Sequence, residues 1–176
     1  PAYMQIRNEL ALIRWRSNGG FKCPVVIRVT YGGYLQGGAV YHSQCGEVAF
    51  THVPGLHVVA PSTPADARGL LQAAIRSDDP VLYLEHRALY WTRGDVPEGE
   101  DAALVPLGRA VIRRPGTDVT IVSWSRMAQA ALAAANDLAT EGIEAEVIDL
   151  RSLAPLDLDT VLASVGRTGR LVVAHE

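Results

Sequence analysis

Cysteine and aromatic residues are scarce in this sequence. Only two of its 176 residues are cysteines, and Phe, Trp and Tyr together account for 6%. Cys23 and Cys45 lack the spacing of metal-ligand pairs, and a disulfide framework is typical of much smaller secreted domains. We therefore expect two reduced thiols in an intracellular protein.

Long apolar runs and an excess of positive charge are also missing. No run approaches the ~20 apolar residues that a membrane-spanning helix needs. The net charge is −3, from 16 Lys and Arg against 19 Asp and Glu. A basic excess is the usual electrostatic signature of proteins that bind nucleic acid or anionic membranes. We therefore expect neither nucleic acid nor a membrane as a partner.

The sequence does contain the composition of a folded α/β protein. Hydrophobic residues make up 48%, and short β-branched runs alternate with segments of helical periodicity, a pattern typical of mostly parallel sheets covered by helices. Strands are predicted at 24–30, 57–60, 81–85, 118–124, 144–150 and 170–174, and helices at 1–17, 46–52, 64–76, 126–140 and after residue 157. Ser62 or Thr63 is predicted to cap the helix at 64–76, and Ser125 the one at 126–140.

A change in composition indicates two domains. Residues 89–117 contain three prolines and an acidic run, which is typical of a linker, with 107–113 extended along the edge of the second domain. The predicted division is a first α/β domain at 1–88, a linker at 89–117 and a second α/β domain at 118–176. Because the pattern starts and stops within a fold, we expect both domains to be incomplete in this sequence.

A glycine-rich loop follows the first predicted strand and leads to a histidine. Four glycines lie between Tyr31 and His42, and they allow tight turns and close approach of the backbone to another group. Such a loop can hold a proton-transfer group over a ligand, but a lone histidine can equally be a hydrogen-bonded structural residue. Cys45, three residues later, is either a reactive thiol or an inert half-buried one. The loop lacks the Gly-x-Gly-x-x-Gly spacing of a dinucleotide-binding turn.

Several collinear motifs resemble one family over the whole chain. They include Pro1-Ala-Tyr-Met-Gln-Ile-Arg-Asn-Glu9, Gly38-Ala-Val-Tyr-His-Ser-Gln44, Pro54-Gly-Leu-His-Val-Val-Ala-Pro-Ser-Thr-Pro64, Asp79-Pro80, Glu85-His86 and Ala145-Glu-Val-Ile-Asp-Leu-Arg151. In order and spacing they resemble the β subunit of a thiamin-diphosphate-dependent 2-oxoacid dehydrogenase. The His-Ser-Gln and Glu-His-Arg motifs are most similar to branched-chain 2-oxoacid enzymes, with pyruvate dehydrogenase β subunits as the alternative.

The resemblance implies a fold, a cofactor and partners. The fold would be a transketolase-like pyrimidine-binding domain followed by a transketolase C-terminal domain. Thiamin diphosphate would be shared with an α subunit that holds Mg²⁺, in an α2β2 assembly. The enzyme would decarboxylate a 2-oxoacid and pass the acyl group to a lipoyl-bearing acyltransferase. Such complexes occupy the bacterial cytoplasm or the mitochondrial matrix.

The resemblance also assigns residues. His42 matches a histidine that faces the cofactor and would be catalytic, while Ser43 and Gln44 would orient the loop and Tyr41 would pack. Some relatives bind K⁺ at positions matching Ala74, Ser77 and Asp79, although an ordinary polar helix end explains the same residues.

One departure from the family leaves a second interpretation open. The family's activating glutamate, and the aromatic residue that packs on the cofactor's aminopyrimidine ring, match positions before Pro1. A non-catalytic fragment or interaction module of the same fold is therefore the alternative to an enzyme subunit.

Overall fold

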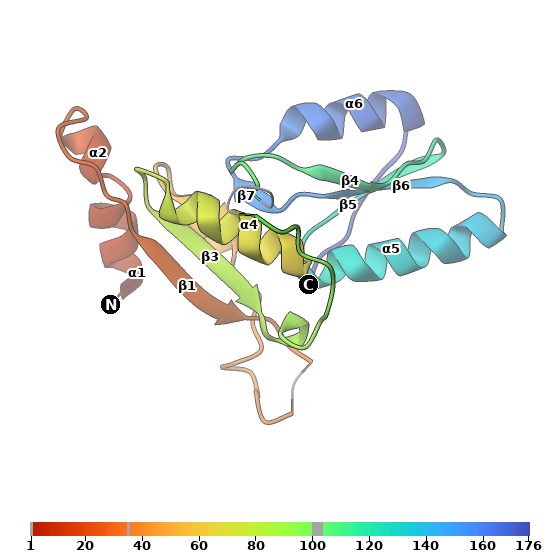
Figure 1. Cartoon of the computed structure of the whole chain (residues 1–176), viewed down its shortest axis with the longest axis horizontal. Coiled ribbons are helices and arrows are strands. Elements are labelled where there is room, and N and C mark those ends of the chain that lie inside the picture. Colours follow the sequence, from red (N-terminus) through yellow and green to blue (C-terminus); the bar gives the residue numbers. More distant parts are fainter. Residues whose placement is uncertain (1, 35, 100–103) are drawn as a thin grey trace.

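The computed structural model describes residues 2–34, 36–99 and 104–176. It contains two four-stranded sheets, each covered by helices, which lie side by side in the molecule (Figure 1). The predicted α/β architecture with two mostly parallel sheets is confirmed.

The first sheet has the strand order β1-β3-β2-β7. Its strands are β1 (Val26–Tyr31), β2 (His57–Val59), β3 (Val81–His86) and β7 (Ser152–Ala154). The pairs β1–β3 and β2–β3 are parallel, with Val26 opposite Val81 in the register. Strand β7, which the sequence pattern did not predict, comes from the second half of the chain and pairs antiparallel with β2. One sheet is thus built from both halves.

Helices of the first half cover both faces of this sheet. They are α1 (Ala2–Gln5), η1 (Ile6–Leu10), α2 (Ile13–Arg16), α3 (Val48–Thr51), α4 (Pro64–Ile75) and η2 (Arg87–Leu89). Leu70 and Ala74 of α4 pack against Val59, Val81 and Tyr83. On the other face, Ala11, Val53 and Leu56 pack against Val58 and Leu82.

The ends of two helices correct or refine the sequence-based expectations. The single helix predicted over 1–17 is interrupted, because the amide of Ala11 bonds to the carbonyl of Ile6 and forms a π-turn. At α4, Thr63 is the capping residue, since its hydroxyl accepts the amide of Asp66 at 3.1 Å.

The second sheet has the order β4-β6-β5-β8. Its strands are β4 (Val111–Arg114), β5 (Val119–Ser123), β6 (Ala145–Asp149) and β8 (Leu171–Val173). Strand β4 lies within the predicted linker, 89–117, and pairs antiparallel with β6 at the edge of the sheet. Helices α5 (Ser125–Thr140) and α6 (Leu158–Thr168) cover opposite faces (Figure 1).

The predicted cap of α5 is wrong. Ser125 is the first helical residue, with φ +53°, and Trp124 occupies the cap position without a side-chain hydrogen bond to the helix. Helix α6, by contrast, has a side-chain cap, because the carboxylate of Asp157 accepts a hydrogen bond from the amide of Thr160. The turn into α5 therefore depends on a non-glycine residue in the left-handed region, which is uncommon and is typical of a constrained junction.

A buried cluster of charges joins the two sheets. Asp149 on β6 is fully buried, and Asp66 at the start of α4 is 3% exposed. The guanidinium of Arg113 donates to both carboxylates, reaching Asp149 Oδ2 from Nη2 at 2.9 Å. Ser62 donates to Asp149, and Arg151 Nη1 lies 3.4 Å from Asp66 Oδ1. Burial raises the pKa of the Asp149 carboxyl despite the Ser62 hydrogen bond and the charge of Arg113.

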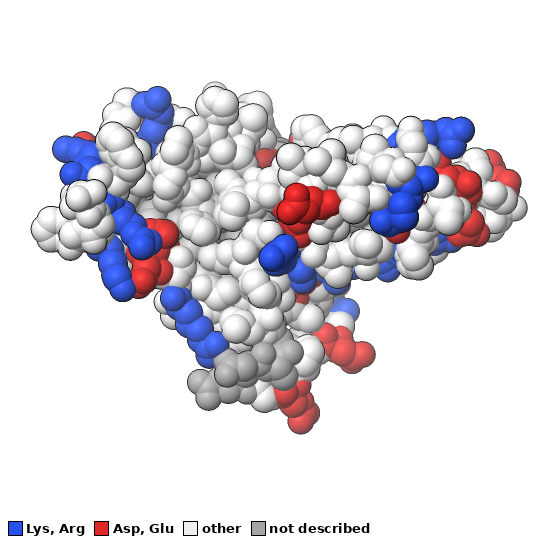
Figure 2. Space-filling view, turned by 90° about the horizontal axis from the view of Figure 1, so that it is seen from above, with Lys and Arg blue, Asp and Glu red and all other residues white. Residues whose placement is uncertain are grey.

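The surface carries charges of both signs. Figure 2 shows Lys and Arg beside Asp and Glu at several places on one face, separated by wide areas of uncharged side chains. Exposed pairs such as Arg16–Glu9 and Lys22–Asp78 belong to this surface. Of the helices that the structure describes, none is both long and apolar enough to span a membrane.

Replacing glycine with alanine is expected to have opposite effects on stability at two positions. A Cβ at Gly116 would lie 2.2 Å from backbone atoms of Ala145 and Glu146, whereas one at Gly166 in α6 would meet nothing within 4 Å. Gly116→Ala is therefore expected to lower the free energy of unfolding by about 1–3 kcal/mol or more. Gly166→Ala, the matched control, is expected to raise it by about 0.5–1 kcal/mol. Urea unfolding would measure both, and equal stability of the two variants would contradict the close packing of Gly116 on β6.

Candidate functional site

The loop predicted from its glycines leaves β1 and returns beside it. The amide of Gly32 donates to the carbonyl of Gln44 at 3.1 Å, which closes the base of the loop. Gly32 has φ +86°, and a Cβ there would lie 2.2 Å from Nε2 of His86. Only glycine meets both conditions, so the loop is anchored where its backbone touches the histidine that ends β3.

The structure presents His42 on the outside of this loop. Its side chain is exposed, and its amide donates to the carbonyl of Gly38 at 3.1 Å. Within the described residues, the imidazole makes no hydrogen bond. An imidazole without a hydrogen-bond partner among the described residues is available to a ligand or to another subunit, and the catalytic role of His42 stays a prediction.

The three neighbours of His42 differ in their surroundings. Tyr41, expected to pack, is 85% exposed within this chain. Ser43 is half-buried and Gln44 is exposed. Both line a shallow hollow of about 530 Å³, together with Gly33, Tyr34, Cys45, Gly46 and Glu176. His42 is not among the lining residues.

Cys45 is held as a protonated thiol. Its Sγ donates to Oε2 of Glu176 at 3.1 Å. Burial, together with the hydrogen bond and negative charge of Glu176, raises the pKa of the Cys45 thiol to about 12. A thiol with so high a pKa is a poor nucleophile, so the inert alternative is favoured over the reactive one.

A cleft that the sequence did not reveal lies where β2 and β3 end beside α4. It measures about 440 Å³. Its polar wall contains Arg28 ion-paired with Glu85, which also accepts the hydroxyl of Tyr90 at 2.9 Å. Pro64, Leu71 and Leu89 are among its apolar lining residues. Open α/β sheets bind ligands at the carboxyl ends of their strands. Pro64 and Glu85 belong to motifs in the sequence, but those motifs did not indicate that the two residues share a cleft.

The predicted K⁺ positions form a hydrogen-bonded helix end. Ser77 donates to the carbonyl of Asp79 at 3.0 Å, and the amide of Asp79 donates back to Ser77 Oγ at 3.1 Å. Arg14 Nη1 donates to both carboxylate oxygens of Asp79 at 2.7 and 2.8 Å, and Ala74 is buried. These contacts account for the residues as a polar helix end, and K⁺ binding stays a prediction.

Both halves of the chain match known protein-family models. Residues 2–92 match the pyrimidine-binding domain of transketolase, and residues 108–176 match the transketolase C-terminal domain. A solved structure described as a split-gene transketolase, an inactive β4 tetramer, superposes with a TM-score of 0.73 at 29% identity. That superposition covers 99% of this chain and 55% of the other.

The curated relatives are β subunits of several enzymes. One is the β subunit of acetoin:2,6-dichlorophenolindophenol oxidoreductase from Cupriavidus necator, 53% identical over 98% of this chain and 50% of the relative. Another is the 2-oxoisovalerate dehydrogenase β subunit of Bacillus subtilis, 44% identical over 100% of this chain and 53% of the relative. The pyruvate dehydrogenase β subunit of Leifsonia xyli is 48% identical over 100% and 51%.

These matches agree with the architecture and with the motifs. The chain spans about half the length of the curated relatives that it matches, and the two matched domains follow one another in the order of the two observed sheets. The chain therefore belongs to the transketolase family, and its relatives include the β subunits of 2-oxoacid dehydrogenases.

Proposed function

We propose that this chain is the part of a 2-oxoacid dehydrogenase β subunit that presents a catalytic histidine to thiamin diphosphate. One observation supports this best: both domains align with such β subunits over the length of the chain, at 44 and 48% identity. The imidazole of His42, which is exposed and has no hydrogen-bond partner among the described residues, is the feature of this chain that fits a cofactor held largely by another subunit.

In the proposed reaction, the cofactor and the residues of this chain have different roles. When bound, thiamin diphosphate would supply a nucleophilic carbon and an electron sink for the decarboxylation of a 2-oxoacid. His42 would supply and remove protons beside the reacting carbon. Ser43 and Gln44 would hold the loop so that the imidazole keeps its position.

The remaining components would come from partners. An α subunit in an α2β2 assembly would hold the diphosphate through Mg²⁺, and a lipoyl-bearing acyltransferase would accept the acyl group. Exposed aromatic side chains, such as Tyr41 at 85% and Trp91 at 87% exposure, would be covered by such partners. Aromatic residues are enriched at protein interfaces.

For the substrate we propose a branched-chain 2-oxoacid, on the strength of the His-Ser-Gln and Glu-His-Arg motifs. A second candidate is acetoin, because an acetoin oxidoreductase β subunit is 53% identical to this chain. Pyruvate is the third, since pyruvate dehydrogenase β subunits are 44–48% identical. A hydrophobic pocket discriminates between substrates that differ by one methylene by only ~1–3 kcal/mol. The preferred substrate therefore has to be determined by measuring turnover.

The test is turnover by the full-length β subunit produced together with its α subunit. With thiamin diphosphate and Mg²⁺, reduction of 2,6-dichlorophenolindophenol would be followed with 3-methyl-2-oxobutanoate, pyruvate and acetoin. We expect the highest kcat/KM with 3-methyl-2-oxobutanoate, by ~10-fold or more over pyruvate. A preference for acetoin would replace the proposed substrate and leave the family assignment intact.

The non-catalytic alternative has a different outcome. In that case the assembly would form, but thiamin diphosphate would not bind in isothermal titration calorimetry and none of the three substrates would be turned over. Cofactor binding with turnover of any one of them would exclude an interaction module without chemistry.

A further inference from the structure

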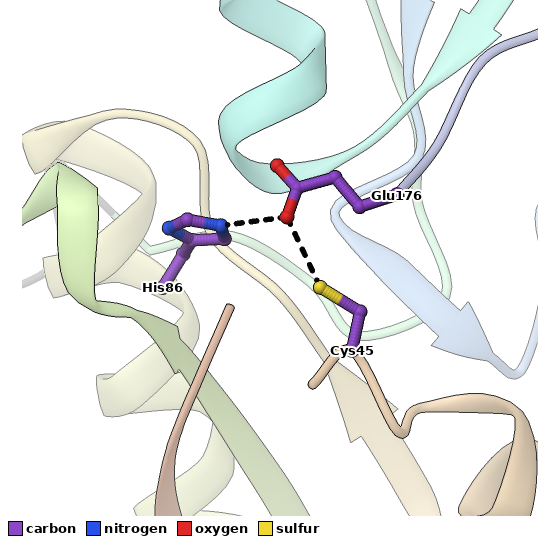
Figure 3. Close-up of side chains that lie close together, drawn as sticks. All are labelled: Cys45, His86 and Glu176. Carbon is purple, nitrogen blue, oxygen red and sulfur yellow. Dashed lines mark hydrogen bonds and ion pairs between the residues drawn. The ribbon is translucent and has the colours of Figure 1, made fainter. Parts of the chain in front are cut away.

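Three side chains from distant parts of the sequence meet beside the anchored loop. Cys45 lies at the end of the loop, His86 ends β3, and Glu176 follows β8. Figure 3 shows the carboxylate of Glu176 between the other two side chains. Its Oε2 lies 3.1 Å from Cys45 Sγ and 3.1 Å from His86 Nε2. One ligand atom of each residue falls within 4.8 Å of the others.

The three residues differ in burial: His86 is buried, Cys45 is half-buried and Glu176 as a whole residue is exposed. The His86 side chain is 1% exposed and that of Glu176 16%. Tyr31 packs edge-on against the His86 ring at 5.3 Å between centroids, and Trp124 stacks on His175 at 5.1 Å. A small cavity of about 10 Å³ adjoins all three side chains. That volume is close to the space that a single bound water needs.

A second carboxylate, that of Glu47, lines the same cavity. Glu47 is 6% exposed, and its Oε1 accepts the indole N–H of Trp124 at 3.0 Å. Its Oε2 is buried and has no hydrogen-bond partner within the described residues. A buried carboxylate oxygen without a partner is costly, and a cation in the cavity would give it one.

We propose that Cys45, His86 and Glu176 form a binding site for Zn²⁺, with Glu47 facing it. Thiolate, imidazole and carboxylate are the three side-chain donors that zinc accepts together, and sites with three protein ligands keep a position for water. Zinc bond lengths of ~2.0–2.3 Å place tetrahedral ligand atoms roughly 3.3–3.6 Å apart. The observed separations of 3.1 Å and up to 4.8 Å need only small side-chain rotations to match.

Zn²⁺ binding requires that protons leave Cys45 Sγ and His86 Nε2. In the metal-free chain the Cys45 thiol donates to Glu176, and the Ala88 amide donates to Nδ1 of His86 at 3.2 Å. The neutral ring then carries its proton on Nε2 and donates it to Glu176. Zinc displaces the thiol proton to solvent, and the ring proton moves to Nδ1 through solvent exchange. A protonated Nδ1 can no longer accept the Ala88 amide, so the hydrogen bond that caps η2 breaks in the same step.

The site would tie the loop to both domains. Cys45 is three residues from His42, whereas His86 belongs to the first sheet and Glu176 follows the last strand of the second. Zinc bound by all three would fix the end of the loop that carries His42. This consequence concerns metal binding by the chain and does not depend on which substrate the assembly uses.

The test uses the full-length chain with its α subunit, dialysed against a chelator and titrated with Zn²⁺ or Co²⁺. We expect one Zn²⁺ per β subunit by mass spectrometry under native conditions and, with Co²⁺, the ultraviolet thiolate-to-cobalt charge-transfer band. Cys45→Ser is expected to abolish that band and weaken Zn²⁺ binding at least ~100-fold, and Glu47→Gln to weaken it ~10–100-fold. Cys23→Ser, which removes the sequence's other cysteine, is the control and should bind as the wild type does.

Two results would overturn the proposal. One is Co²⁺ binding to the wild type without the charge-transfer band, and the other is unchanged Zn²⁺ affinity in Cys45→Ser. Because His86→Gln could disturb the buried ring, Glu176→Gln serves as the milder second variant. Wild-type Zn²⁺ affinity in a folded Glu176→Gln protein would likewise contradict the three-ligand site.

Discussion

Replacing His42 with alanine is expected to lower turnover of the assembled enzyme ~10²–10⁴-fold, the range typical for loss of a positioned proton-transfer group. Stability should not change, because the side chain is exposed and makes no hydrogen bond within the described part of the chain. Reduction of 2,6-dichlorophenolindophenol under saturating thiamin diphosphate would give kcat and KM, and thermal unfolding would give the stability.

His52→Ala is the matched control for this prediction. His52 is also an exposed histidine of the first half, and it follows α3 away from the loop. Its turnover should stay within about twofold of the wild type. If His42→Ala retained wild-type kcat with the preferred substrate, the catalytic role would be wrong. Loss of thiamin diphosphate binding would instead assign His42 to holding the cofactor, and calorimetry distinguishes that case.

Replacing Arg113 with leucine is expected to lower the free energy of unfolding by about 3–5 kcal/mol. Arg113 donates to Asp66 and Asp149, which are 3% and 0% exposed. Removing one partner of a buried ion pair leaves uncompensated charge in a medium of low polarity. Denaturant unfolding at neutral pH would measure the loss, with the slope of the transition reporting whether it stays two-state.

Two further variants make the interpretation specific. Arg16→Leu breaks the Arg16–Glu9 pair, whose side chains are 56% and 62% exposed, and should cost less than about 1 kcal/mol. Arg113→Leu combined with Asp149→Asn removes one of the stranded charges and should recover part of the loss. If Arg113→Leu and Arg16→Leu had the same free energy of unfolding, the buried cluster would not stabilise the contact between the two sheets.

The fold was largely predictable because its elements have strong local signals. Strands β3 and β6, predicted from the runs at 81–85 and 144–150, are inner strands and almost completely buried, and β-branched residues between turn formers mark such strands well. Strand β7 escaped prediction because its three residues, Ser152–Ala154, have no periodicity of their own. Its extended form depends on pairing with β2, a partner far away in the sequence.

The candidate site was predictable from the sequence only where its residues lie in one continuous segment. His42 and its loop were found because glycines and a histidine lie within twelve residues. The grouping of Cys45 with His86 and Glu176 was not found, since its members are separated by 41 and 90 residues and only the packing of the two sheets brings them together. Sequence spacing identifies metal ligands when they share a turn or a helix face.

The pairing of β7 with β2 has a consequence for how the protein can be divided. A polypeptide ending at residue 117 would keep β1, β2 and β3 but lose β7, so one side of β2 would face solvent with open amide and carbonyl groups. Such a bare edge is a template for strands of other molecules. The first half produced by itself would therefore self-associate. Although the two matched domains are separate in the sequence, the first needs β7 from the second half to stay soluble.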